Sequence, residues 1–155
     1  MQTAQTMMGP PGDDDFAASA PTAVVRVCSG VLMVAGLLTA LTGVQLLLSR
    51  IVGALAIVPY VLVLLGVATI GVGWMAGRAR WWAATSGLTL GVVLTLVNLG
   101  WFVYAFAGGI YSCMSMVSVP VSIGASVAMV FTLTPVRRAT EARERMRAQG
   151  LDVGI

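Results

Sequence analysis

The stretch Gly77-Arg78-Ala79-Arg80-Trp81-Trp82, GRARWW, interrupts a chain that otherwise carries almost no charge. Residues 51–77 before it contain no Asp, Glu, Lys or Arg, and the same is true of residues 81–136, which begin within it. A helix needs about 20 apolar residues to cross the hydrocarbon core of a bilayer. Both flanks are therefore long enough to hold membrane spans, and GRARWW is predicted to be the turn between two of them.

The composition agrees with a membrane location. Hydrophobic residues make up 58% and charged residues 10% of the 155 residues, and the mean hydropathy is +0.93. A soluble domain usually has about 25% charged residues. The sequence therefore indicates an integral membrane protein, and its polar remainder is too short to form a separate soluble domain.

The uncharged runs on the two sides of GRARWW hold four spans in total. Residues 27–49 also lack charge, whereas the run 81–136 is too long for one span and is broken within AGGIYSCMSM, where Gly108 and Gly109 disfavour helix and Ser112 and Ser115 favour a loop. We therefore expect an all-α membrane protein, a four-transmembrane-helix bundle over residues 23–136. The expected spans are residues 27–48, 54–76, 81–107 and 117–136.

The two ends of the chain differ in character. Residues 1–22 are polar, contain Pro and Gly and have little to bury, so we expect a disordered tail. Residues 137–155 form a basic tail whose helix formers continue the fourth span past Pro135, with an expected pairing of Glu141 to Arg145 and a helix stop at Gly150. This tail is expected to be a short helix.

The arginines indicate how the spans are oriented. Basic residues accumulate on the cytoplasmic side of a membrane, and four spans place both termini on one side. If both termini are cytoplasmic, Arg50 is the only arginine on the outer side of the membrane. Guanidinium pairs also suit phosphate, but arginines beside a membrane ordinarily set topology. We therefore interpret one group as anchors at the cytoplasmic interface: Arg78, Arg80, Trp81, Trp82, Arg137 and Arg138.

A resemblance follows from the same span ends. The second span ends in Gly-Arg, the third opens with Trp and Ala, and the fourth leaves the membrane as Pro135-Val136-Arg137-Arg138. Over about residues 27–138 this pattern resembles small four-span proteins of bacterial inner membranes. The resemblance implies a multi-pass protein of that membrane with both termini cytoplasmic, and it brings no functional residues with it.

The residue types limit the chemistry that the chain can perform. The chain has no His, and no acidic residue lies within an expected span. These absences exclude imidazole-ligated metals, a Ser-His-Asp triad and the usual carboxylate site for proton or ion coupling. We therefore expect no enzyme activity, no cofactor or metal site, and no nucleic-acid partner.

Small residues recur at helical spacing within the spans. Lipid provides no hydrophobic drive between helices, so small residues that let backbones approach closely are what hold such helices together. Whether the second row on the fourth span packs within the protein or against a partner stays open. The rows are Ala83, Gly87, Gly91 and Thr95 followed by Asn98 on the third span, and Ser118, Ser122 and Ser126 beside Pro120, Gly124 and Ala128 on the fourth.

Two amides, Gln45 and Asn98, are the strongest polar groups expected inside the spans. Each lies about 25 Å along its helix from the cytoplasmic end, at 1.5 Å per residue. We interpret them as hydrogen-bonded to each other or to a neighbouring helix.

Function is expected to come from contacts between helices. The predicted role is an accessory or scaffolding subunit of a larger membrane complex, with membrane lipids and other membrane-protein helices as partners, in a hetero- or homo-oligomer. The alternative is a homo-oligomeric channel or facilitator with a polar path near Gln45 and Asn98.

Overall fold

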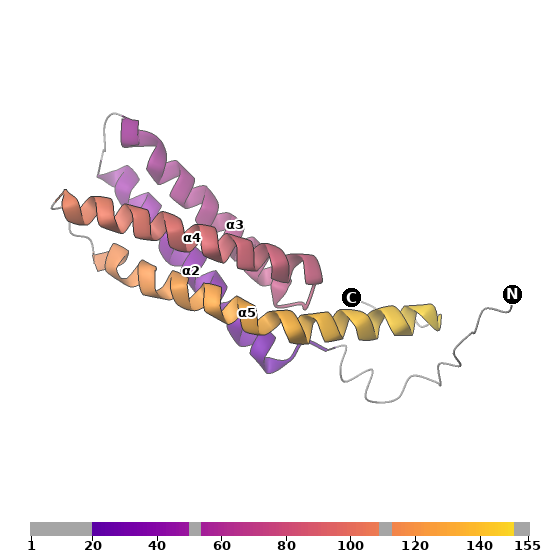
Figure 1. Ribbon diagram of the computed structural model, residues 1–155. Coiled ribbons are helices and arrows are strands. Elements are labelled where there is room, and N and C mark those ends of the chain that lie inside the picture. Colours follow the sequence, from indigo (N-terminus) through magenta and orange to yellow (C-terminus); the bar gives the residue numbers. More distant parts are fainter. Residues whose placement is uncertain (1–19, 50–53, 109–112, 151–155) are drawn as a thin grey trace, which may run out of the picture.

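The computed structural model describes residues 20–49, 54–108 and 113–150 (Figure 1). Within these ranges the chain is helical, with no strand. Its elements are α2 (Ala23–Leu48), a short 3-10 helix η1 (Ala54–Ile57), α3 (Val58–Ala76), α4 (Trp81–Ala107) and α5 (Cys113–Ala148). The expected all-α class is confirmed for the described residues, and the four α-helices are each long and apolar enough to cross a membrane.

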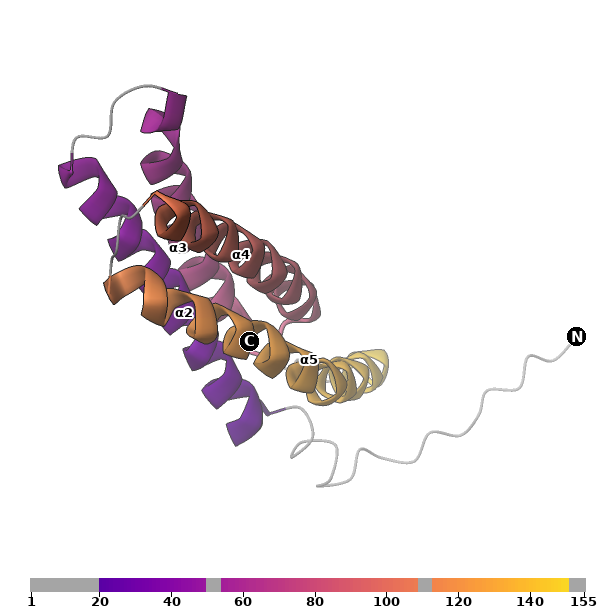
Figure 2. The same cartoon turned by 60° about the vertical axis from the view of Figure 1, so that its left-hand side comes forward.

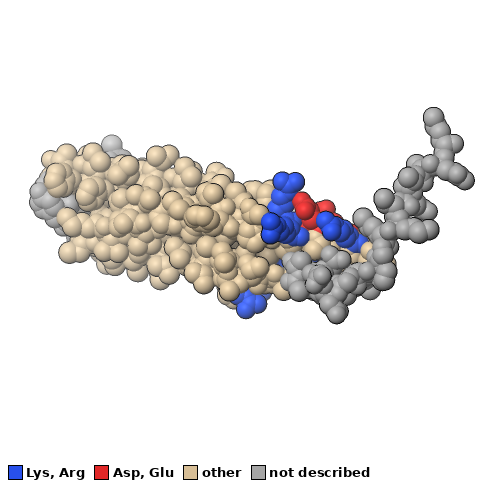
Figure 3. Space-filling view, turned by 60° about the horizontal axis from the view of Figure 1, so that its bottom comes forward, with Lys and Arg blue, Asp and Glu red and all other residues tan. Residues whose placement is uncertain are grey.

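The helices lie side by side and alternate in direction (Figures 1 and 2). Helix α2 packs mainly against α3 and α5, and α4 packs against the same two helices. The start of α2, the turn from α3 to α4 and the carboxyl-terminal part of α5 therefore share one end. On the face that Figure 3 shows, the charged side chains of the described residues gather at one end. We call this the charged end.

Two helix boundaries follow from local chemistry. Helix α2 begins at Ala23, four residues before the expected start, because the Thr22 hydroxyl caps it and accepts from the Val25 amide at 3.4 Å. Helix α3 begins only at Val58, after η1, and has Pro59 in its first turn, where a missing amide proton is harmless. Helix α4 has the expected bounds.

Helix α5 differs most from expectation. Its span was expected to start at residue 117 with Cys113 and Ser115 in a loop, but the helix begins at Cys113 and runs without a break for 36 residues, through Pro120 and Pro135. Backbone groups that face hydrocarbon must be satisfied within the chain, and this requirement overrides the loop preference of serine. The helix ends at Ala148, near Gly150, whose φ is 79°.

The closest helix contact is a seam of glycines between α2 and α3. A Cβ atom placed on Gly66 would lie 2.5 Å from the Gly36 carbonyl oxygen and 2.7 Å from the Ala40 backbone nitrogen. A Cβ on Gly43 would lie 2.7 Å from the Pro59 carbonyl oxygen. The backbones of α2 and α3 therefore touch, and this contact requires glycine.

Large apolar side chains fill the space between the four helices. Leu32 of α2, Leu94 of α4 and Met129 of α5 are all fully buried and belong to one cluster. A smaller cluster at the other end contains Leu62 and Trp101. The outward surfaces carry exposed Val, Leu, Ile and Phe, as a lipid-facing surface requires.

Two expectations lie outside the described residues. These are the disordered tail over residues 1–22, of which only 20–22 are described, and the turn at Arg50.

The glycine seam yields a stability prediction. Gly66→Ala should lower the free energy of unfolding by about 1–3 kcal/mol, because the new methyl group meets rigid backbone and forces the helices apart. Gly71→Ala is the matched control on the same helix, since its Cβ would meet nothing within 4 Å. The measurement is an unfolding titration in SDS from mild detergent. Equal stability of the two variants would contradict a tight α2–α3 contact.

Candidate functional site

The centre of the molecule contains a buried polar link between α2 and α4. Asn98 is 2% exposed, and its Nδ2 donates to the Thr39 hydroxyl at 3.0 Å and to the Leu94 carbonyl at 2.9 Å. Thr39, itself fully buried, donates to the Ala35 carbonyl at 2.9 Å and so is free to accept from the amide. The expected interhelical bond of Asn98 is therefore present.

Gln45 does not take part in that link. Its side chain is exposed on α2, and the amide nitrogen of Asn98 bonds to Thr39, so of the two expected arrangements Asn98 adopts the bond to a neighbouring helix. The reason is helical geometry. Gln45 lies six residues after Thr39, which turns it roughly 240° around the helix axis, away from the face that meets α4.

A second polar link joins α4 to α5. The hydroxyls of Thr95 and Ser126 lie 3.0 Å apart, and each also reaches its own helix, at Gly91 and Ser122 respectively. Gly91 makes room for this link, because a Cβ there would lie 3.1 Å from the Ser126 hydroxyl. The expected small-residue row of the third span therefore faces α5.

The same row continues toward the charged end at Gly87. A Cβ on Gly87 would lie 2.7 Å from the terminal methyl of Met129 and 3.1 Å from a methyl of Leu32. Gly87 thus leaves the space in which side chains from α2 and α5 meet α4. Replacement of this glycine would displace flexible side chains and not backbone.

The two rows of α5 separate to opposite faces. Ser118 and Ser122 are buried and donate to carbonyls of their own helix, those of Ser115 and Val119. Gly124 is exposed, and a Cβ atom placed on it would meet nothing within 4 Å. The serine row therefore belongs to the internal packing, whereas the Gly124 row faces outward.

The expected interface anchors gather at the charged end. Arg78 lies over the Trp74 ring at 5.4 Å, and the side chains of Trp81 and Trp82 are 42% and 52% exposed. Exposed aromatic rings beside guanidiniums suit the boundary between lipid and water. Arg80 differs from the others, because it is half-buried.

Past the membrane span, Arg137 and Arg138 are exposed on α5. Arg137 Nε donates to Glu141 Oε1 at 2.8 Å, so the expected pairing of Glu141 with Arg145 is wrong. Both arginines lie one helical turn from Glu141, and sequence spacing alone does not choose between them. This pair is solvent-exposed and contributes little to stability.

Arg143, which no sequence pattern indicated, joins α5 to the turn between α3 and α4. Its Nη1 donates to the Ala79 carbonyl at 3.1 Å. Ala79 is buried and has a φ of 53°, a left-handed conformation that turns its carbonyl away from α3. Burial, and then the positive charges of Arg147 and Arg80, lower the pKa of Arg143 from its ordinary value. No spacing rule links residue 143 to a turn so far away in the sequence.

Two shallow hollows open on the outer surface between α3 and its neighbours. One, of about 390 Å³, lies between α2 and α3 at the charged end and has Arg26, Trp74 and Arg78 at its edge. The other, of about 290 Å³, lies between α3 and α4 at the opposite end, beside Trp101 and Tyr104. Both are mainly apolar and suit an acyl chain or a side chain of another helix.

The comparisons with known proteins add no relative. No family model, curated protein or solved structure matches this chain. In the part of the chain that the structure describes, no three His, Cys, Asp or Glu side chains form a group that could hold a metal ion. The arrangement can hold helices together and present cationic groups to the membrane surface.

The Asn98 link predicts an energetic coupling. The variants Asn98→Leu and Thr39→Val should each lower stability, and a double-mutant cycle should give a coupling of about 0.6–2 kcal/mol, because both remove one hydrogen bond. Thr89→Val is the matched control, since that exposed hydroxyl on α4 bonds only to Thr85 of its own helix among the described contacts. Unfolding in SDS provides the measurement. If the coupling energy between Asn98→Leu and Thr39→Val were as small as that between Asn98→Leu and Thr89→Val, the hydrogen bond between α2 and α4 would be refuted.

Proposed function

We propose that this protein is an accessory or scaffolding subunit of a larger membrane complex, which acts through contacts between helices. It forms a four-helix transmembrane bundle in a bacterial inner membrane. Its partners are membrane lipids and the helices of other membrane proteins. The proposal includes no enzymatic step.

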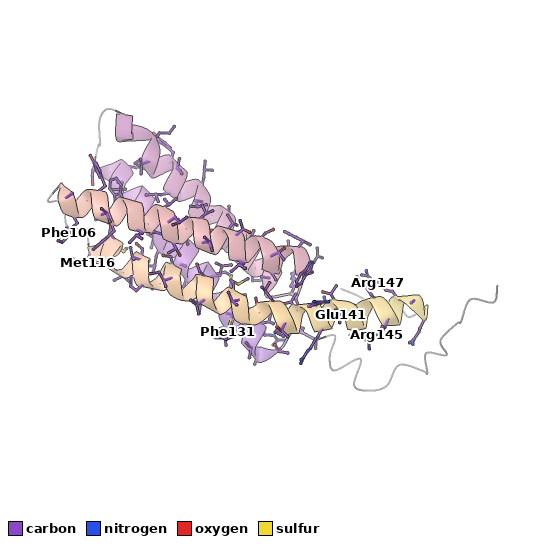
Figure 4. All side chains as sticks on the ribbon, in the orientation of Figure 1. Phe106, Met116, Phe131, Glu141, Arg145 and Arg147 are labelled. Carbon is purple, nitrogen blue, oxygen red and sulfur yellow. The ribbon has the colours of Figure 1, made fainter. Side chains whose placement is uncertain are left out.

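The outward row of α5 carries this proposal. Gly124 faces outward with open space around it, between the exposed side chains of Pro120 and Val127. Phe131, 66% exposed, lies seven residues further along α5 on the same face (Figure 4). A small residue framed by larger ones lets a second helix approach closely and fix its position. The protein's own packing does not use this surface.

The channel alternative has weaker support. A shared pore in a ring of copies needs polar side chains on an outward face. Asn98, Ser118 and Ser122 are instead buried within one copy and bond to neighbours there. Only Gln45, of the polar residues expected along that path, is exposed.

The proposed orientation places the charged end in the cytoplasm. Arg26, Arg78, Arg80 and the arginines of α5 lie at helix ends that share this side. A positive end of a membrane protein remains on the cytoplasmic side during insertion. Cys113, exposed at the first residue of α5, then lies at the outer surface.

Labelling of single cysteines tests the orientation. In a Cys28→Ala background, an impermeant maleimide should modify Cys113 in intact cells. In a second variant with Cys28→Ala, Cys113→Ala and Arg138→Cys, the new thiol on exposed α5 should react only after the membrane is opened. The reverse pattern for the two thiols would place the termini outside.

Native mass measurement after mild extraction tests the role itself. We expect a stoichiometric complex with a different membrane protein, and we expect Gly124→Leu to reduce its recovery at least about 10-fold by blocking close helix approach. Gly71→Leu, at an outward glycine of α3 with nothing within 4 Å, is the matched control. A closed ring of identical copies with flux in liposomes supports the channel instead. A solitary, inert monomer contradicts both.

A further inference from the structure

A cationic hollow lies at the charged end, where α5 passes the turn between α3 and α4. Its volume is about 420 Å³. We call it the arginine pocket and define it by its lining residues, which come from that turn, from the start of α4 and from α5. They are Ala79, Arg80, Trp81, Trp82, Thr140, Arg143, Glu144 and Arg147.

The fold brings the cations of this pocket together. Arg143 is held by its hydrogen bond to the Ala79 carbonyl, and Arg147 follows it by one turn on the same side of α5. Figure 4 shows Arg147 and Arg145 on opposite sides of that helix. Arg80 comes from the other wall, where it precedes the first residue of α4. Two separate segments therefore deliver guanidiniums to one hollow.

The pocket contains a hydrogen-bond donor that no described residue uses. Arg80 Nε is buried and has no hydrogen-bond partner among the described residues, and a buried unpaired donor is costly. Among the described lining residues, three carry a guanidinium group and one, Glu144, carries a carboxylate. Burial, and after it the positive charges of Arg147 and Arg80, lower the pKa of Arg143. The start of α4 adds the positive end of a helix dipole. A bound anion would relieve each of these penalties.

The surroundings indicate which anion is suitable. Guanidinium groups donate paired hydrogen bonds that match phosphate oxygens. Trp81 and Trp82, both exposed, lie on the wall of the pocket, and tryptophan settles at the level of lipid headgroups. The pocket thus combines phosphate-binding groups with the depth at which lipid phosphates lie.

We propose that the arginine pocket binds the phosphate of an anionic phospholipid headgroup. The site is distinct from the outward row of α5, so it stands independently of the proposed scaffolding role. It also assigns Arg80 and Arg147 a binding role that Arg138 and Arg145, which do not line the pocket, do not have.

Native mass spectrometry of the purified full chain in neutral detergent tests the site. Titration with phosphatidylglycerol should give one tightly retained lipid, with at least about 10-fold preference over phosphatidylcholine. Arg80→Gln with Arg147→Gln should weaken this binding by about 25-fold, since one arginine beside an anionic surface contributes roughly 1 kcal/mol, or about 5-fold. The matched control, Arg138→Gln with Arg145→Gln, removes the same charge outside the pocket and should change binding less than about 3-fold.

Equal losses in the two double variants would show diffuse surface attraction and overturn the proposal. A lack of preference for phosphatidylglycerol over phosphatidylcholine would overturn it as well. Inorganic phosphate supplies the third arm: displacement of the lipid by millimolar phosphate would assign the pocket to a soluble anion instead. Retention of the lipid under that competition supports a headgroup site.

If the Arg80 variant does not fold, a single variant and a melting temperature still test the proposal. Arg147→Gln alone, on an exposed part of α5, should lower lipid retention about 5-fold. The unmodified protein should also melt at a higher temperature with phosphatidylglycerol than with phosphatidylcholine, because a ligand bound only by the folded state stabilises it. Failure of both results would overturn the proposal.

Discussion

The backbone contact between α2 and α3 sets the positions of the other elements. Gly36 and Gly66 allow carbonyl and amide groups of the two helices to meet without side chains between them. Lipid offers no hydrophobic gain for helix association, so this close packing supplies much of the attraction. With α2 held against α3, the remaining face of α2 receives α5, and α4 closes the arrangement between α3 and α5. The Asn98 and Thr95 links then form across faces that the packing has already aligned.

The polar groups of the interior are matched to one another almost completely. Hydroxyls of Thr39, Thr69 and Ser122 bond to carbonyls of their own helices, which lets them lie in an apolar interior at little expense. Asn98 has more hydrogen-bonding groups than one helix can satisfy, so it reaches a second helix. The interior therefore holds helices in register, and contacts with other molecules are left to the outer surfaces, among them the outward row of α5, the charged end and the two hollows beside α3.

At the charged end, the extension of α5 beyond the membrane has a structural effect. Because the helix continues through Pro135 to Ala148, Arg143 reaches the carbonyl of Ala79 and fixes the turn of GRARWW. The same continuity brings Arg147 opposite Arg80. A tail that merely followed the last span as a separate short helix would not form the arginine pocket.

The number of spans and half of their bounds follow from the sequence alone, because the length of an uncharged run and the thickness of a bilayer are one-dimensional quantities. The sequence also determined that Asn98 needs a partner on another helix. The packing of the helices in three dimensions selects Thr39 as the partner of the Asn98 amide nitrogen, turns the serine row of α5 inward and Gly124 outward, and brings Arg143 to the turn at Ala79. These outcomes depend on the rotation of each helix about its axis, and in a chain that is apolar on every side the sequence pattern leaves that rotation open until the backbones pack.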